Sequence, residues 1–205
     1  MTALPIFRPE VFVALVLFAF ASSITPGPNN TMLMASGANF GLKRSLPHWF
    51  GIIVGFSLLM LACGMGIGGL FTAYPVLHEV LKWGGAAYMV YLAIKIGTSG
   101  SLSPTKGGAP PRPMTFWGAA AFQLVNVKAW AMGLGAVTTY IPAQHYFANL
   151  LVGIVVFVSM FWCGLLWMSF GMVLRRYLER PVILRTFNIV MALLLLASLY
   201  PLFLH

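Results

Sequence analysis

The sequence predicts an all-α integral membrane protein with six transmembrane helices, arranged as two inverted repeats of three helices each. Of the 205 residues, 60% are apolar or aromatic, only 7% are charged, and the mean hydropathy is +0.90. Soluble domains carry roughly 25% charged residues, so a chain this depleted of charge needs lipid as its solvent. The apolar residues also fall into separate runs, and basic residues gather in alternate breaks between those runs.

Each apolar run of about 20 residues is long enough to cross the hydrocarbon core as a helix. The predicted spans are residues 11 to about 38, 48–74, 75–98, 114–141, 146–174 and 182–204. The third span is the least apolar, because only residues 83–94 are free of charge between Lys82 and Lys95. Lysines near a helix end extend to the lipid headgroups, so this run is still predicted to span.

The basic residues predict the orientation of the chain. Nine of them would lie on one side of the membrane, namely Lys43, Arg44, Lys95, Lys106, Arg112, Arg175, Arg176, Arg180 and Arg185. Only Arg8 and Lys82 would lie on the other side. The positive-inside rule then places the first, third and fifth connections in the cytoplasm of a bacterium and both termini in the periplasm. This distribution explains the net charge of +9 without nucleic-acid binding.

A segment rich in glycine, serine and proline, residues 99–113, predicts a flexible cytoplasmic linker between two halves. Residues 1–98 form the first three-helix repeat and residues 114–205 the second. Two units with an odd number of spans must have opposite orientations, and inverted repeats recur in secondary transporters.

The first span is interrupted by Thr25, Pro26, Gly27, Pro28, Asn29 and Asn30. The two prolines remove two amide donors, so a continuous helix is not expected there. Carbonyl groups near residues 22–24 lose their partners, and an unsatisfied buried group costs on the order of 2–7 kcal/mol. A half-helix beginning near Asn29 would direct its positive N-terminal end at the break, which suits a carboxylate. The alternative is a packing kink without a ligand.

Asn126 and Lys128 occupy the corresponding place in the fourth span. A lysine at mid-membrane costs at least about 2.5 kcal/mol unless it meets a cavity or a partner. Glu10, Glu79 and Glu179 are the only acidic residues, and none lies at mid-span. Lys128 is therefore predicted to meet an anion or exposed carbonyls, unless the span begins later and the lysine extends to the surface. Trp130 would line the same cavity.

Three other features carry weaker predictions. His48 titrates near neutral pH when it is exposed, so it is a candidate for proton coupling together with Lys128, although a structural role is the more common one for such a residue. Gly51 and Gly55 favour close helix packing, and a homodimer is possible. No cysteine or histidine cluster predicts a metal or a cofactor.

Three blocks of the sequence resemble the LysE/RhtB family of amino-acid exporters, over essentially the full length. The blocks are residues 24–29, then residues 38–41 with 43–45, and finally residues 126–130. The resemblance implies export of amino acids or related metabolites, driven by the proton-motive force. Val127 stands where the family's second motif usually has proline, so the fourth helix is expected to be less sharply broken than the first.

The predicted function is a secondary active exporter in the bacterial inner membrane, in which the two breaks meet near the midplane and bind a small-molecule substrate. Export of another cargo, such as a metal cation, is an alternative, but the lack of Asp and of mid-span carboxylates disfavours it. A membrane-embedded enzyme or a structural subunit is a further alternative. The dispersed histidines His48, His78, His145 and His205 do not form a catalytic pattern.

Overall fold

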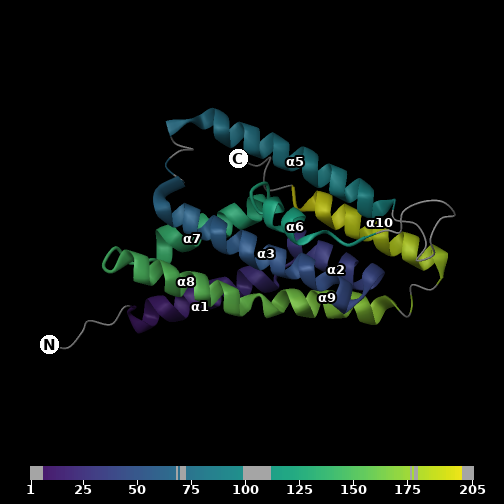
Figure 1. The fold of residues 1–205 in the computed structure, drawn as a ribbon, viewed down its shortest axis with the longest axis horizontal. Helices are drawn as coiled ribbons and strands as arrows, with labels where there is room; N and C mark the ends of the chain where they lie inside the picture. Colours follow the sequence, from purple (N-terminus) through teal and green to yellow (C-terminus); the bar gives the residue numbers. More distant parts are fainter. Residues whose placement is uncertain are drawn as a thin grey trace.

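A computed structural model describes residues 7–67, 69, 73–98, 112–175, 177 and 180–199. All regular elements in these residues are helical (Figure 1). They are α1 (Pro9–Ile24), α2 (Pro28–Phe40), α3 (Leu42–Ala62), the π-turn η1 (Cys63–Ile67), α5 (Pro75–Gly97), α6 (Phe116–Phe122), α7 (Val127–Tyr140), α8 (Tyr146–Met160), α9 (Trp162–Arg175) and α10 (Pro181–Ala197). The predicted linker lies outside the described residues, except for residues 112 and 113.

Two helical stretches are long and apolar enough to cross a membrane, Leu42–Ile67 and Tyr146–Leu174. A third span results if α1 and α2, which are bent by 49°, count as one broken helix. Within the described part of α10, Val182–Ala197 is a shorter apolar helix. The helical membrane character is thus confirmed, and the bounds of the predicted fifth span agree with the structure. The number of six spans stays a prediction.

The predicted start of the second span at His48 is wrong, because α3 begins six residues earlier at Leu42. Gly41 ends α2 with a φ of 75° and lets the chain turn directly into the next helix. Pro47 lies inside α3 and removes the amide that would bond to the carbonyl of Lys43. Lys43 lies in the exposed first turn, where water can replace that bond.

The predicted fourth span is interrupted as well, although Val127 stands in place of a proline. Four residues separate α6 from α7, and three separate α1 from α2. The amides of residues 123–126 bond to carbonyls three residues earlier, in tight turns that end α6. Asn126 then adopts an extended conformation, with a ψ of 99°, and Val127 begins α7. The break therefore precedes Val127 and needs no proline.

Helices from the two halves of the chain pack closely against each other. The main contacts pair α2 with α9, α3 with α6, α5 with α10, and α1 with α8. Glycines set the closest approaches: Gly37 contacts the carbonyl of Met168, and Gly171 contacts the carbonyl of Met34. A side chain at either glycine would overlap the partner backbone, so these contacts require glycine.

The predicted glycine face of α3 is used inside the chain. Gly51 lies against the carbonyl of Phe116, and Gly55 lies against Ala120, both on α6. Close packing of the glycine face is therefore confirmed, and a second copy of the chain would need another surface.

Several polar side chains lie inside the helix bundle beside its apolar core, and many large apolar side chains lie on its outside. The buried polar residues are Asn30, Thr31, Ser36, Ser45, His48, Gln123, Asn126, Asn149 and Asn188. The outer face of α8, in contrast, exposes Phe147, Leu151 and Val155. Polar groups inside and apolar groups outside are what a protein surrounded by lipid requires.

Candidate functional site

The two helix breaks meet near the middle of the long axis of the molecule (Figure 1). The side-chain amides of Asn29 and Gln123 join them by two reciprocal hydrogen bonds. Nδ2 of Asn29 donates to Oε1 of Gln123 at 2.9 Å, and Nε2 of Gln123 donates to Oδ1 of Asn29 at 3.1 Å. Gln123 is fully buried. The start of α2 is therefore fixed against the end of α6.

Side chains from α2 and α9 satisfy the carbonyls that the first break leaves without helical partners. Nδ2 of Asn30 donates to the carbonyls of Ser23 and Thr25, at 2.7 and 2.8 Å. The indole Nε1 of Trp167 donates to the carbonyl of Ile24 at 3.1 Å. These bonds meet the demand that the prolines create, because buried carbonyls rarely stay unpaired.

Lys128 caps the same end of α1 with its ammonium group. Nζ donates to the carbonyl of Thr25 at 3.0 Å, to Oγ1 of Thr25 at 2.9 Å, and to the carbonyl of Pro26 at 3.2 Å. An ammonium has three donors, and these three bonds use all of them. The positive charge also lies at the negative end of the helix dipole of α1. Of the two partners predicted for Lys128, the structure shows exposed carbonyls.

Gly27 provides the space for this lysine. A methyl group built on Gly27 would lie 2.8 Å from Cδ and 3.0 Å from Nζ of Lys128. Both distances are shorter than ordinary van der Waals contact, so any larger residue would displace the lysine.

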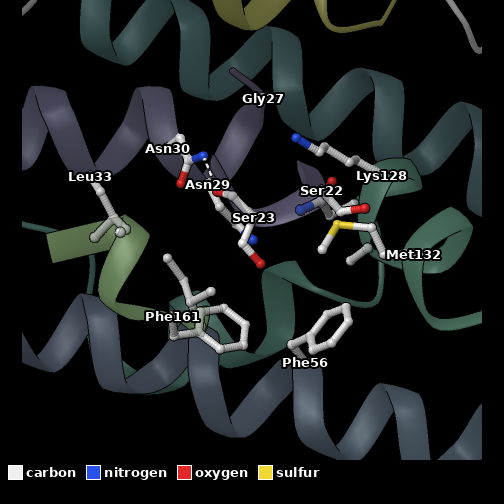
Figure 2. Close-up of a pocket in the computed structure, with 14 residues that line it drawn as sticks. Ser22, Ser23, Gly27, Asn29, Asn30, Leu33, Phe56, Lys128, Met132 and Phe161 are labelled. Carbon is white, nitrogen blue, oxygen red and sulfur yellow. Dashed lines mark hydrogen bonds between the residues drawn. The ribbon is translucent and has the colours of Figure 1, made fainter. Parts of the chain in front are cut away.

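A small cavity of about 40 Å³ lies between the two breaks and the helices α3 and α9. Its walls are formed by Ser22, Ser23, Gly27, Asn29, Asn30, Leu33, Ile52, Phe56, Asn126, Lys128, Ala129, Met132, Phe161 and Gly164. Figure 2 shows Lys128 extending from α7 toward Gly27, with Phe56 and Phe161 across the cavity from it. Water molecules fit this volume, whereas pockets for small organic ligands hold roughly 300–1,000 Å³. In this conformation the cavity is therefore too small for an amino acid.

Two buried polar atoms in the cavity wall have no hydrogen-bond partner among the described residues. They are Oγ of Ser23 and Oδ1 of Asn126. Buried polar atoms are rarely left unpaired unless a water or a ligand meets them. The N-terminal ends of α2 and α7 begin beside the same cavity, at Pro28 and Val127, and the first turn of a helix presents unpaired amides.

The structure brings most of the predicted site residues together. Gly27, Asn29, Asn30, Asn126 and Lys128 line the cavity, and Thr25 and Pro26 hold the ammonium of Lys128. Pro28 begins α2 directly beside them. Two predicted residues, Trp130 and His48, lie elsewhere.

Trp130 and His48 do not line this cavity. The indole Nε1 of Trp130 donates to the carbonyl of Leu124 at 2.8 Å and so supports the second break. His48 is 1% exposed, and its Nδ1 lies 3.0 Å from Oγ of Ser36. It borders a different, larger cavity.

Sequence reasoning missed two residues of the site. Gln123 precedes Asn126 by three residues in the same polar segment, and this spacing was the available signal. Trp167 lies in a long apolar run, and no local pattern marks it as a partner of the first break. Its partner, the carbonyl of Ile24, is 143 residues away along the chain.

Comparison with known proteins identifies the family. The sequence model described as "LysE type translocator" matches residues 20–198. A curated "Cysteine/O-acetylserine efflux protein" of Escherichia coli is 34% identical over 191 residues, which cover 92% of this chain and 95% of that protein. A protein with the same description from Shigella sonnei is 34% identical over 190 residues, covering 91% and 94%. No solved structure matches the chain. Because the family model and these relatives match most of its length, the chain belongs to the LysE type translocator family.

Proposed function

We propose that the protein is a secondary active exporter of small neutral amino acids or closely related metabolites across the bacterial inner membrane, driven by the proton-motive force. One observation carries the proposal: a lysine ammonium is held on the open carbonyl end of a broken helix, beside a cavity that joins two such breaks. Broken helices that meet in this way form the substrate sites of many secondary transporters. The relatives described as cysteine and O-acetylserine efflux proteins support the substrate class.

The cavity walls favour a neutral amino acid over a cationic one. The lining residues include no acidic side chain, so a second ammonium on the substrate would lack a carboxylate partner. Leu33, Ile52 and Phe56 form an apolar wall that suits a short, uncharged side chain. Oγ of Ser23 and Oδ1 of Asn126 remain to bond a polar group of the substrate.

On substrate binding, Lys128 would change its hydrogen-bond partners. In this conformation all three donors of its ammonium are used by Thr25 and Pro26, so a substrate carboxylate cannot yet bind this group. The substrate's own ammonium would take over the two carbonyls, and Lys128 would turn to the substrate carboxylate. The N-terminal ends of α2 and α7 would stabilise that carboxylate further. The lysine thus holds the place of the substrate ammonium until the substrate arrives.

Alternating access would widen the small cavity and open it first to one side of the membrane and then to the other. The packing supports two inverted repeats, because each helix contact has an equivalent with the two halves interchanged. In such repeats α3 corresponds to α8, α1 to α6, and α5 to α10. The contact of α3 with α6 is then equivalent to that of α8 with α1, and α5 packs on its own equivalent, α10. We propose six spans on this basis, with α1 and α2 forming the first and α6 and α7 the fourth.

The described basic residues support a cytoplasmic position for one end of the bundle. Lys43 and Arg44 begin α3, Lys95 lies in the last turn of α5, and Arg185 lies in the first half of α10. The end of α5 and the start of α10 lie toward the same end of the molecule in Figure 1. The positive-inside rule places that end in the cytoplasm and both termini in the periplasm.

Lys128 is also the stronger of the two candidates for proton coupling. Its ammonium must leave the carbonyls of Thr25 and Pro26 during each cycle, and a protonated lysine binds them far better than a neutral one. His48 is the second candidate, because its Nε2 is buried without a partner among the described residues.

Uptake into everted membrane vesicles tests the proposed function, because the cytoplasmic face then points outward. Respiring vesicles that contain the protein are expected to accumulate labelled cysteine, serine or O-acetylserine, and a protonophore should abolish the accumulation. Lys128→Ala should reduce uptake at least about tenfold, since one lost charge-assisted bond alone is worth about 1.5–3 kcal/mol.

Lys43→Ala provides the matched control, because Lys43 is exposed in the first turn of α3 and does not line the cavity. Size-exclusion chromatography in detergent would establish that both variants are folded. Uptake of divalent cations instead of amino acids would favour the alternative cargo. Normal amino-acid uptake by a folded Lys128→Ala protein would refute the role given to the lysine.

A further inference from the structure

A second, much larger cavity of about 670 Å³ lies between α2, α3, α5 and α6. Its lining residues are Met32, Ala35, Ser36, Asn39, Phe40, His48, Tyr88, Tyr91, Leu92, Lys95, Ile96, Arg112, Pro113, Met114, Thr115 and Gly118. This volume falls within the roughly 300–1,000 Å³ of small-molecule sites, whereas the cavity between the breaks holds about 40 Å³. The conformation therefore has room for an amino acid here and not at the breaks.

We propose that this second cavity is an entry vestibule, in which Arg112 binds the carboxylate of an amino acid from the cytoplasm before the substrate reaches the helix breaks. The proposal rests on the proposed export function and adds a second substrate site to it.

The second cavity lies at the end of the bundle that carries most of the basic residues. Asn39 and Phe40 end α2, Lys95 and Ile96 lie in the last turn of α5, and Arg112 shortly precedes α6. These segments are the ones that the positive-inside rule assigns to the cytoplasm. An exporter must collect its substrate from this side.

Two helices connect the vestibule with the cavity between the breaks. On α2, Ser36 and Met32 line the vestibule, and Asn29 lines the small cavity, at spacings of four and three residues that place all three on one face. On α3, His48 lines the vestibule, and Ile52 and Phe56 line the small cavity at steps of four residues.

The two cavities are separate in this conformation. Met32 of α2 lines the vestibule and Ile52 of α3 lines the small cavity, with only 5% and 1% of their surfaces exposed. Oγ of Ser36 and Nδ1 of His48, 3.0 Å apart, link α2 to α3. Separation of α2 from α3 would join the two cavities into one route.

The charges of the vestibule suit a carboxylate. Arg112 and Lys95 contribute two positive charges, and the lining includes no acidic residue. A guanidinium binds a carboxylate with two parallel hydrogen bonds, so Arg112 provides both attraction and orientation. A concave site lined by one sign of charge also raises the local concentration and the association rate of the opposite charge. The phenols of Tyr88 and Tyr91 add polar groups at the wall.

Transport kinetics in everted vesicles test the vestibule. Arg112→Gln is expected to raise the half-saturating amino-acid concentration at least about threefold and to leave the maximal rate within about twofold, because the breaks are unchanged. Arg112→Lys should fall between Arg112→Gln and the original protein. Lys43→Gln removes a charge from the same end without touching the lining and should change neither value.

A thiol-labelling measurement separates a substrate site from a lipid headgroup site, since both would bind an anion. The two native cysteines, Cys63 and Cys163, are first replaced by alanine, and Tyr91→Cys is then introduced into this cysteine-free protein. A sulfonate-bearing methanethiosulfonate added at the cytoplasmic face should label the new thiol, and the transported amino acid should slow the labelling. This protection should be lost in Arg112→Gln.

The possible outcomes are distinct. Unchanged kinetics in Arg112→Gln, or labelling that responds to phosphatidylglycerol content and not to the amino acid, would overturn the vestibule. Absence of labelling would overturn it as well, because the cavity would then hold no water. Absence of amino-acid uptake by the unmodified protein would instead count against the export function on which the vestibule rests.

Discussion

Asn29 and Gln123 exchange two hydrogen bonds between their side-chain amides, at 2.9 and 3.1 Å, and so join the two helix breaks across 94 residues of sequence. Neither residue bears a charge, and each amide satisfies the other in the interior of the bundle. Gln123 also donates to the carbonyl of Ala119 at 3.0 Å, which ties the pair to the end of α6. The relative position of α2 and α6 therefore depends on a neutral polar contact.

A double-mutant cycle at this pair should show strong coupling. Asn29→Ala leaves the buried amide of Gln123 partly unsatisfied, and Gln123→Ala leaves the half-buried amide of Asn29 so, and each should lower the free energy of unfolding by about 1–3 kcal/mol. The double variant removes both amides and should lose less than the sum, with a coupling energy of about 0.5–3 kcal/mol. Thermal unfolding in detergent measures both quantities. Strict additivity would show that the pair does not hold the breaks together.

Gly27→Ala should impair transport while the protein stays folded. The added methyl group would meet the flexible end of Lys128, at 2.8 Å from its Cδ, and not the backbone, so the lysine moves and the helices do not. Export in the vesicle assay should fall at least about fivefold, which corresponds to roughly 1 kcal/mol. Gly84→Ala is the control, because nothing lies within 4 Å of a methyl group at that position. Equal export by both variants would argue against a functional role for the position of Lys128.

Gly37→Ala and Gly171→Ala should destabilise the fold itself. In both cases the new methyl group would overlap a backbone carbonyl of the partner helix, Met168 for Gly37 and Met34 for Gly171, and neither can yield locally. Overpacking of this kind costs typically about 1–3 kcal/mol. The two native cysteines are buried, so their reaction with a thiol-reactive dye during heating reports unfolding. An unfolding temperature equal to that of Gly84→Ala would contradict the close contact of α2 with α9.

Trp167→Phe should remove a hydrogen bond that stabilises the first break without leaving a large cavity in the core. The phenyl ring keeps most of the packing but loses the indole donor to the carbonyl of Ile24, 3.1 Å away. The expected loss is about 1 kcal/mol of unfolding free energy. Trp117→Phe is the matched change, because Trp117 is 77% exposed. If both substitutions lower the unfolding temperature equally, the hydrogen bond to Ile24 has no measurable role.

The sequence by itself determined the membrane-helical class, the first break and the family motifs, because each depends on local chemistry. Two prolines and a glycine in an apolar run end a helix regardless of its neighbours, and α1 indeed stops at Ile24. The apolar composition likewise excludes a soluble domain. For the same reason, the bounds of the long apolar run at Tyr146–Leu174 were predicted correctly.

Only the tertiary structure decided which groups meet at the breaks. Lys128 and Thr25 are 103 residues apart, and Trp167 and Ile24 are 143 residues apart, so no local pattern predicts either pair. The second break carries no proline, and its turns are supported by Gln123 and by the indole of Trp130. In a bilayer, each freed backbone group must find a partner within the protein, and the fold alone determines which side chain comes near enough to be that partner.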